Sequence, residues 1–382
     1  MQQIHGEEDW RHWVPAPPGR VFDLCRKLPE LPGLWDLAER RDIIPHWTAL
    51  LRSNARYLLE VLGAAGWDAE RRRAARALAI FERLLDDLDR GRAGEIRTVH
   101  HATLVREHLL RGHDLSDPYR GIKAREASRW LPEASEALSR AWRSGEASPT
   151  EGALATVLGD LLAGNLFDLG SGATREAFRR GSLDMEGARR RFAKAARQSL
   201  ERMDAGRRDL LLGPARPLDA PASGHMLLFA DNAGADFLLG VLPAALFFAR
   251  RWAVKLVVNS LPASNDVSVD EARAHLALLR DVPACPVAQA MAAGRLELVA
   301  SGTGSPGIDV RHVGDALNRA AQGTAWLLIE GQGRAIETNW PTRFRCPVLR
   351  AAAVKDPLVA AEIGAAPGSA LLSWDADEPE RG

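Results

Sequence analysis

The hydrophobic and polar positions follow different patterns in the two parts of this chain. From about residue 35 to 210, apolar residues recur at helical spacing in stretches rich in Ala, Arg, Leu and Glu, which predicts a mainly helical part. Further along, short apolar runs of strand-forming residues alternate with helical stretches. The predicted strands cover residues 225–230, 254–260, 296–301, 325–330 and 348–354. The Pro- and Gly-rich segment 210–225 separates the two patterns and is the predicted linker.

The strand pattern predicts the fold class. Strands that are apolar on both faces and joined by helical crossovers are typical of a mainly parallel sheet with helices on both sides. We therefore predict an α/β protein with a three-layer α/β/α core, preceded by a helical N-terminal subdomain. The helical subdomain is predicted to span residues 1–210 and the α/β core residues 211–382.

Composition narrows the choice of partners. The 382 residues include 50 Lys and Arg against 50 Asp and Glu, and this balance disfavours nucleic acid and membrane partners. Three widely spaced cysteines disfavour a disulfide framework or a zinc knuckle. The acidic N-terminus has no apolar signal segment, and no run of uncharged residues is long enough to span a membrane. We expect a cytoplasmic protein with a small-molecule ligand, in an oligomeric state that the sequence leaves open.

Polar or small residues follow every predicted strand. In an open parallel sheet, ligands bind beyond the carboxyl ends of the strands, so these residues are predicted to converge on one site. For Asp231 alone, a helix cap at the strand–helix turn is an equally good interpretation. The candidates, in strand order, are Asp231 and Asn232, then Asn259 with Asn265 and Asp266, then Ser301 and Gly302, then Glu330, and finally Lys355.

Three of these residues suit a metal ion. Carboxylate and amide oxygens favour Mg²⁺ or Mn²⁺ and also accommodate Co²⁺ or Ni²⁺, so Asp231, Asn232 and Asp266 are the predicted ligands of one divalent ion. Three protein ligands leave positions for water and a substrate oxygen, which is the arrangement for metal-assisted hydrolysis. Asp231 and Asp266, with Lys355, are therefore also the predicted catalytic residues.

An anion site is predicted beside the metal. Lys355, Arg334 and the amides of the glycine-rich loop 301–307 would bind phosphate oxygens. That loop lacks the Lys-Ser/Thr pair of a phosphate-binding P-loop, and a plain turn after a strand is its simpler interpretation. The full predicted set of substrate- and phosphate-binding residues is Asn259, Ser301, Gly302, Glu330, Arg334 and Lys355.

Several motifs, taken in order, resemble the damage-control phosphatase (DUF89) family, and within it subfamily II. The resemblance covers roughly residues 30–370, and Cys346 and Lys355 extend it beyond the last motif. The matching segments are TVHHATLVREHLL (98–110), DPYRGIKAREA (117–127), LLAGNLFDLG (161–170), FADNAGAD (229–236), NSLPASNDV (259–267), SGTGSPGIDV (301–310) and EGQGRAIETN (330–339).

The resemblance implies an α/β/α phosphatase with a helical N-terminal part that needs a divalent metal. The implied substrates are small phosphomonoesters, and for subfamily II 4′-phosphopantetheine or its oxidised and otherwise damaged forms, which places the protein in coenzyme A metabolism. The family's metal ligands fall on Asp231, Asn232 and Asp266, the residues chosen above from strand-end chemistry. Asp168 also matches the family, as a site residue or as a structural acid.

Two positions depart from the subfamily pattern. Gln332 replaces Met in the EGMGR signature, and Ala127 stands where relatives have Asn. The Gln permits a sugar-phosphate phosphatase as one alternative function, and a sensor that binds phosphopantetheine without hydrolysis is another. Either water or the Asp231 carboxylate could attack phosphorus, and both routes are open at this point. The tryptophans are interpreted as core packing.

Overall fold

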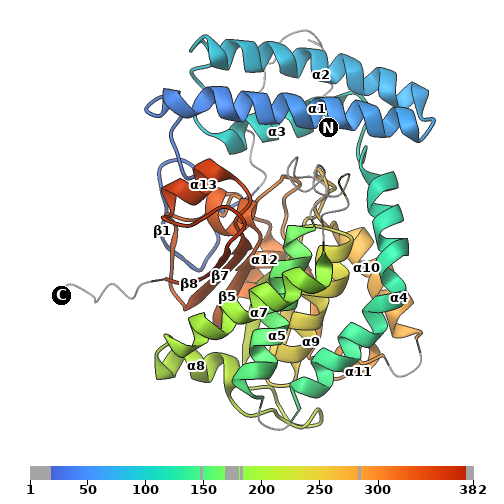
Figure 1. Cartoon of the computed structure of the whole chain (residues 1–382), viewed down its shortest axis with the longest axis vertical. Coiled ribbons are helices and arrows are strands. Elements are labelled where there is room, and N and C mark those ends of the chain that lie inside the picture. Colours follow the sequence, from blue (N-terminus) through green and yellow to red (C-terminus); the bar gives the residue numbers. More distant parts are fainter. Residues whose placement is uncertain (1–18, 147–148, 168–179, 181–183, 283–284, 376–382) are drawn as a thin grey trace, which may run out of the picture.

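The architecture was obtained as a computed structural model, which describes residues 19–146, 149–167, 180, 184–282 and 285–375. Figure 1 shows three N-terminal helices as a layer across one end of the molecule, with further helices and a sheet beneath them. The sheet is mixed but mostly parallel, so the predicted α/β class is confirmed. The division at residues 210 and 211 stays a prediction.

The layer at the end of the molecule consists of α1 (Ile44–Ala64), α2 (Asp68–Asp89) and α3 (Val99–Gly112). Proline occupies the first turn of α1, where its missing N–H costs nothing. Trp47, Leu51 and Leu58 recur at helical spacing on the buried face of α1. Thr98 begins α3, since its hydroxyl accepts a hydrogen bond from the His101 amide at 3.1 Å.

The second group of helices packs on one face of the sheet. It contains α4 (Arg120–Ser144), α5 (Glu151–Leu166), α7 (Met185–Glu201), α8 (Ala205–Leu212), the π-helical turn η3 (Asp236–Val241) and α9 (Leu242–Ala249). Buried residues surround α5 on nearly all sides, because it packs against α7, η3 and α9 at once. Figure 1 shows α5, α7 and α9 running together beneath the N-terminal layer.

Six strands form the main sheet, in the order β4-β3-β2-β5-β7-β8. All neighbouring pairs are parallel except the last, in which β8 is antiparallel to β7. The five predicted strands are all present, and β8 is an addition. The strands are β2 (His225–Phe229), β3 (Ala253–Val258), β4 (Leu296–Ala300), β5 (Thr324–Glu330), β7 (Val348–Ala353) and β8 (Ala370–Trp374).

Shorter elements complete the chain. They are β1 (Cys25–Lys27) and β6 (Arg343–Phe344), which form a separate two-stranded ribbon, the 3₁₀ turn η2 (Arg41–Ile43), the π-helical turn η4 (Gly333–Glu337), α10 (Val269–Arg280), α11 (Val287–Ala292), α12 (Asp315–Ala321) and α13 (Pro357–Glu362). Within the described ranges no helix is both long and apolar enough to cross a bilayer.

The central strand β2 contributes to a hydrophobic core on each side of the sheet. Met226 and Leu228 pack with the helices α4, α5, α7 and α9, whereas Leu227 and Phe229 pack with α1, α2 and α3. Alternate residues of a strand point to opposite faces, so an apolar run buries both. The N-terminal helices therefore share a core with the sheet, and this fixes them over its carboxyl edge.

Candidate active site

The carboxyl edge of the sheet brings several predicted residues together. Asp231 and Asn232 follow β2, and Asn232 pairs with Asp266 through an isolated β-bridge. Glu330 ends β5, and its Oε2 accepts a hydrogen bond from the Asp231 amide at 2.9 Å. Lys355 follows β7 and lines the same cavity as Asp231, Asn232 and Asp266. Strands β2, β3, β5 and β7 thus contribute side chains to one place, as the strand-end pattern predicted.

Asp231 is held by a dense set of hydrogen bonds. Its Oδ1 accepts from Arg334 Nε at 3.1 Å, and its Oδ2 accepts from Asn232 Nδ2 at 3.0 Å and Asn165 Nδ2 at 3.3 Å. Asn165 lies in α5, so the helical part of the chain contributes to this position. With 7% of its surface exposed, Asp231 presents a small, fixed carboxylate surface.

Arg334 joins the two aspartates predicted as metal ligands. It lies in η4 with no exposed surface, and its Nη2 donates to Asp266 Oδ2 at 2.6 Å while Nε binds Asp231. The same Asp266 oxygen accepts from Asn259 Nδ2 at 3.1 Å. A buried guanidinium between two carboxylates offsets their mutual repulsion and sets their orientation. Arg334 and Asn259 therefore position the two aspartates from behind.

A buried acidic triad lies beside this arrangement. Asp231, Asp236 and Glu330 each offer a carboxylate oxygen, and these atoms lie within 4.8 Å of one another. In the described part of the chain, Asp236 Oδ1 and Glu330 Oε1 are buried without a hydrogen-bond partner. Unsatisfied buried oxygens fit a bound cation or a retained proton, so this triad could hold a metal ion.

Electrostatics favours protons on two members of the triad when no cation is bound. Burial, and then the Asp231 carboxylate, raise the pKa of Asp236 to about 7. Burial, followed by Asp236 and Asp231, also raises the pKa of Glu330 well above its usual value. The sequence-based prediction omitted Asp236, although DNAGAD shows a second acid five residues after the first.

A cavity of about 380 Å³ opens above these residues, between α1, α3 and the strand-end loops. Asp231, Asn232, Asp266 and Lys355 are among its polar lining residues. Its size is within the usual range for small-molecule sites. The apolar side chains that line it are Leu34, Trp35, Trp47, Leu50, Leu51, Val99, Pro306 and Pro357.

The remaining predicted residues lie behind or beside this cavity. Among the described residues, the cavity lining does not include Asn259, Glu330 or Arg334, which contact the aspartates instead. Ser301 is fully buried and Gly302 donates its amide to Ser260 Oγ, so neither is part of the lining. The glycine-rich loop reaches the cavity further along, through Pro306 and Gly307, while Asp168 falls outside the described residues.

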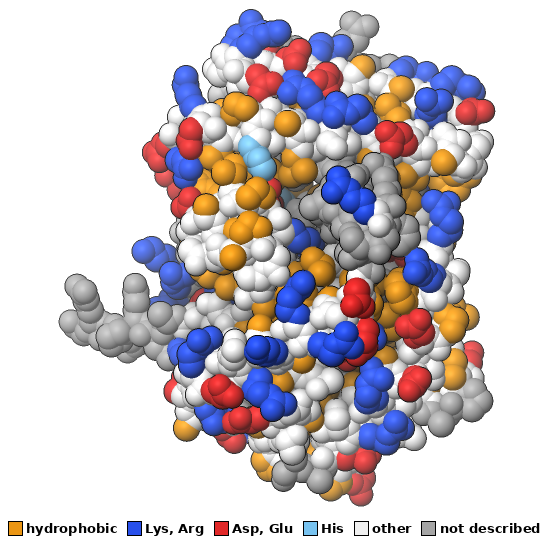
Figure 2. Space-filling model, in the orientation of Figure 1, with side chains coloured by type: hydrophobic (Ala, Val, Ile, Leu, Met, Phe, Trp, Pro, Cys, Tyr) orange, Lys and Arg blue, Asp and Glu red, His pale blue; other side chains and the backbone are white. Residues whose placement is uncertain are grey.

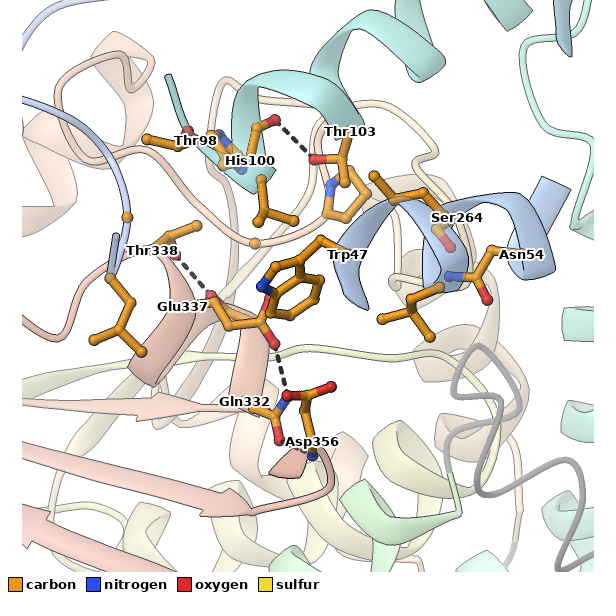
Figure 3. A pocket seen from close by; sticks show the side chains of 18 of the residues that line it. Trp47, Asn54, Thr98, His100, Thr103, Ser264, Gln332, Glu337, Thr338 and Asp356 are labelled. Carbon is orange, nitrogen blue, oxygen red and sulfur yellow. Dashed lines mark hydrogen bonds between the residues drawn. The ribbon is translucent and has the colours of Figure 1, made fainter. Parts of the chain in front are cut away.

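The helical part supplies residues that the sequence did not place. Trp47 belongs to the core, as interpreted, but it also forms part of the cavity wall (Figure 3). His100 and Arg106 of α3 line the cavity as well, and Arg106 is 4% exposed with Nη2 bound to Glu107 Oε1 at 2.7 Å. Burial lowers the pKa of His100. The segment 98–110 was recognised as a motif, but no side chain within it was singled out.

The two departures from the subfamily pattern differ in their relation to the cavity. Gln332 lines it, and its Oε1 accepts hydrogen bonds from the backbone amides of Lys355 at 2.6 Å and Asp356 at 3.1 Å. Gln332 Nε2 donates to Glu337 Oε1 at 2.6 Å, so the amide connects the end of β7 to η4. Ala127 is buried in α4, in the core with α5 and α9.

The parallel sheet with acids and amides at its carboxyl edge defines an α/β protein with a small-molecule site at the strand ends. A family model, the damage-control phosphatase ARMT1-like domain, matches residues 47–371. The chain therefore belongs to this family, and the predicted resemblance is confirmed.

Similar proteins include pantothenate kinase 2 of Arabidopsis thaliana, 33% identical over 282 residues, which cover 68% of this chain and 30% of that protein. A damage-control phosphatase of the same plant, At2g17340, is 29% identical over 262 residues, 68% of this chain and 67% of that one. The 4′-phosphopantetheine phosphatase of Mus musculus is 29% identical over 338 residues, 73% of this chain and 38% of that protein. The chain thus spans about a third of the length of the kinase and mouse relatives.

A crystal structure of a DUF89 family protein from Pyrococcus horikoshii superposes with a TM-score of 0.54. The superposition covers 86% of this chain and 98% of the Pyrococcus horikoshii chain, at 16% sequence identity. Such a likeness shows the shared fold.

Proposed function

We propose that this protein is a divalent-metal-dependent phosphatase for small phosphomonoesters, with 4′-phosphopantetheine or its damaged forms as substrate and the cytoplasm as its location. The observation that carries the proposal is the group Asp231, Asn232 and Asp266, which faces a cavity at the strand edge in a chain of the damage-control phosphatase family. The similarity to the 4′-phosphopantetheine phosphatase of Mus musculus supports the choice of substrate.

Two ligand sets share Asp231, and access to the cavity favours one of them. Among the described residues, Asn232 and Asp266 line the cavity with Asp231, whereas Asp236 and Glu330 do not. A catalytic ion has to reach its ligands and the substrate together. We therefore assign the ion, which can be Mg²⁺, Mn²⁺, Co²⁺ or Ni²⁺, to Asp231, Asn232 and Asp266. The proton-retaining pair Asp236 and Glu330 supports Asp231 from behind.

When bound, a divalent ion supplies positive charge that neutralises the phosphoryl oxygens. Lys355 lines the same cavity as the proposed metal ligands and brings a further positive charge to it. Arg334 holds Asp231 and Asp266 at a fixed separation. Both oxygens of Asp231 accept hydrogen bonds, which lowers the nucleophilicity of the carboxylate and favours attack by water over an aspartyl-phosphate.

The wall of the cavity fits an elongated, largely apolar leaving group. Trp35, Trp47, Leu50 and Leu51 line the cavity, and all come from α1 or the segment before it. The pantetheine arm alternates methylene groups with amides and a branched dimethyl carbon, so burial of its carbon atoms stabilises the complex. Figure 2 shows basic and acidic side chains interspersed over one face.

The direct test is phosphate release from 4′-phosphopantetheine by metal-stripped protein to which each of the four ions is restored. We expect metal-dependent release that Asp231→Asn reduces by at least 100-fold. Asp209→Asn, at an exposed carboxylate, is the matched control and should leave the rate unchanged.

Three other outcomes would redirect the assignment. Faster phosphate release from sugar phosphates than from phosphopantetheine would identify sugar phosphates as the substrate class, which Gln332 permits. Tight binding of phosphopantetheine without release in any metal would indicate a sensor. Trapping of a covalent phospho-enzyme would show that Asp231 is the nucleophile.

A further inference from the structure

One carboxyl group of the cavity has no role in the site described so far. Glu337 ends η4, lines the cavity and is partly exposed. Gln332 Nε2 donates to its Oε1 at 2.6 Å (Figure 3). Because Gln332 Oε1 is already bound to the amides of Lys355 and Asp356, the Gln332 amide group is fixed with its NH₂ toward Glu337.

The surroundings of Glu337 balance opposing effects on its proton. The pKa of Glu337 is raised to about 7, and burial is the largest cause. The hydrogen bond from Gln332 acts in the opposite direction and lowers the pKa. Asp356 and Asp231 raise the pKa further and Lys355 lowers it.

These charged groups belong to elements other than η4. Asp231 follows β2, and Lys355 and Asp356 follow β7. On α1, His46 Nε2 lies 2.7 Å from Asp356 Oδ2. Glu337 thus lines the cavity in surroundings that favour its protonated form.

We propose, on the basis of the phosphatase function above, that Glu337 is the acid that protonates the leaving oxygen of the ester. The P–O bond to water forms as the P–O ester bond breaks, and the ester electron pair goes to the leaving oxygen. That oxygen takes the Glu337 proton and departs as an alcohol. The attacking water leaves two protons on the phosphate as H₂PO₄⁻, and one of them restores Glu337.

Other acids in the site are less suited to this step. Burial also raises the pKa of Asp236 and of Glu330, but among the described residues they are not part of the cavity lining. His100 lines the cavity, yet burial lowers its pKa and so disfavours the protonated imidazole that an acid would need. Glu337 combines access to the cavity with a pKa near the working pH, which is the requirement for a general acid.

The test compares two esters that differ in their need for a proton. The alkoxide of 4′-phosphopantetheine is a poor leaving group, whereas p-nitrophenolate leaves without protonation. We expect Glu337→Gln to lower kcat/KM for phosphopantetheine by about 100-fold or more and for p-nitrophenyl phosphate by less than about fivefold. Glu297→Gln, at an exposed position of β4, is the matched control and should change neither.

A second variant tests the same group through pH. Gln332→Met removes the hydrogen bond that favours the charged form, so the pKa of Glu337 should rise. The alkaline limb of kcat/KM for phosphopantetheine should then move to higher pH, while the profile for p-nitrophenyl phosphate should keep its shape.

Equal losses on both esters, or no loss on either, would overturn the assignment of Glu337. Hydrolysis of p-nitrophenyl phosphate by Glu337→Gln reports a folded, active site, so a selective loss cannot result from unfolding. Absence of release from either ester by the wild-type protein in every metal would reject the phosphatase itself, which is a different result.

Discussion

Replacement of Arg334 by methionine isolates the buried charge arrangement at the centre of the site. Arg334 has no exposed surface and binds Asp231 and Asp266 through two different nitrogens. Methionine fills much of the same volume but cannot donate a hydrogen bond. The variant therefore leaves two buried carboxylates facing each other without the cation between them.

The expected cost follows from this geometry. Removal of one partner from a buried ion pair costs about 3–5 kcal/mol, because the remaining charge stays buried without compensation. For 382 residues the unfolding entropy is about 0.8 kcal/mol per degree, so this cost lowers Tm by about 4–6 °C. A divalent ion should restore part of the loss, since it neutralises the same two carboxylates.

The assay is thermal unfolding of wild-type and Arg334→Met protein, stripped of metal and then with Mn²⁺ added. Arg295→Met is the matched control. Arg295 is 1% exposed and donates to the backbone carbonyls of Arg251, Pro217 and Ala220, not to carboxylates. The control should lose stability to a similar extent but gain no more from Mn²⁺ than the wild-type protein gains.

A double-mutant cycle tests whether the cost arises from the ion pair. Asp266→Asn combined with Arg334→Met should destabilise by less than the sum of the single changes, because the second change removes a charge that the first left unpaired. Additive losses, or a Tm for Arg334→Met within about 1 °C of wild type, would refute this account of the buried charges.

Three further predictions follow from single positions. Gly331 has φ +97°, and a Cβ atom there would overlap the Asp231 carboxyl group, so Gly331→Ala should reduce phosphate release by at least about 100-fold in folded protein. Calorimetric titration with Mn²⁺ should show affinity weakened about tenfold or more by Asp266→Asn and less than about threefold by Asp236→Asn. Burial lowers the pKa of His101 from 6.5 to about 4, so the unfolded chain binds a proton that the folded chain excludes. Stability should fall by up to about 3 kcal/mol as pH falls from 6.5 to 4, and urea unfolding should show a weaker dependence for His101→Gln.

Controls for these predictions are available in the chain. Gly364 also has a positive φ of +68°, but a Cβ atom there meets nothing within 4 Å, so Gly364→Ala should leave phosphate release intact. Stronger loss of Mn²⁺ affinity in Asp236→Asn than in Asp266→Asn would assign the ion to the acidic triad. Identical pH dependence of stability in wild type and His101→Gln would show that this imidazole is not responsible.

The apolar runs were sufficient to predict five strands of the sheet, because strands buried on both faces leave a strong sequence signal. Strand β8 was not predicted, since it is only partly buried and is defined by its antiparallel pairing with β7. The convergence of Asp231, Asp266 and Lys355 was predictable because the ends of parallel strands meet at one edge. The metal and substrate roles of these residues stay predictions.

The cavity wall was not predictable from the sequence. Trp47 and Arg106 reach it only because α1 and α3 pack over the sheet, and no local pattern reports that distant contact. Glu337 was hidden for a different reason. In a π-helical turn the side-chain spacing departs from the usual helical periodicity, so the position of Glu337 relative to Gln332 cannot be read from a helical pattern.

The shared core between the N-terminal helices and the sheet has a consequence for how such proteins diverge. The groups proposed to perform the chemistry come from residues 231–355, whereas most apolar side chains of the cavity wall come from residues before 100. Mutations in the first hundred residues can therefore alter which alcohol is released while the phosphoryl chemistry stays intact. Exchange of α1 and its preceding segment between family members is accordingly a route to new substrate ranges, provided that the side chains buried against Leu227 and Phe229 are retained.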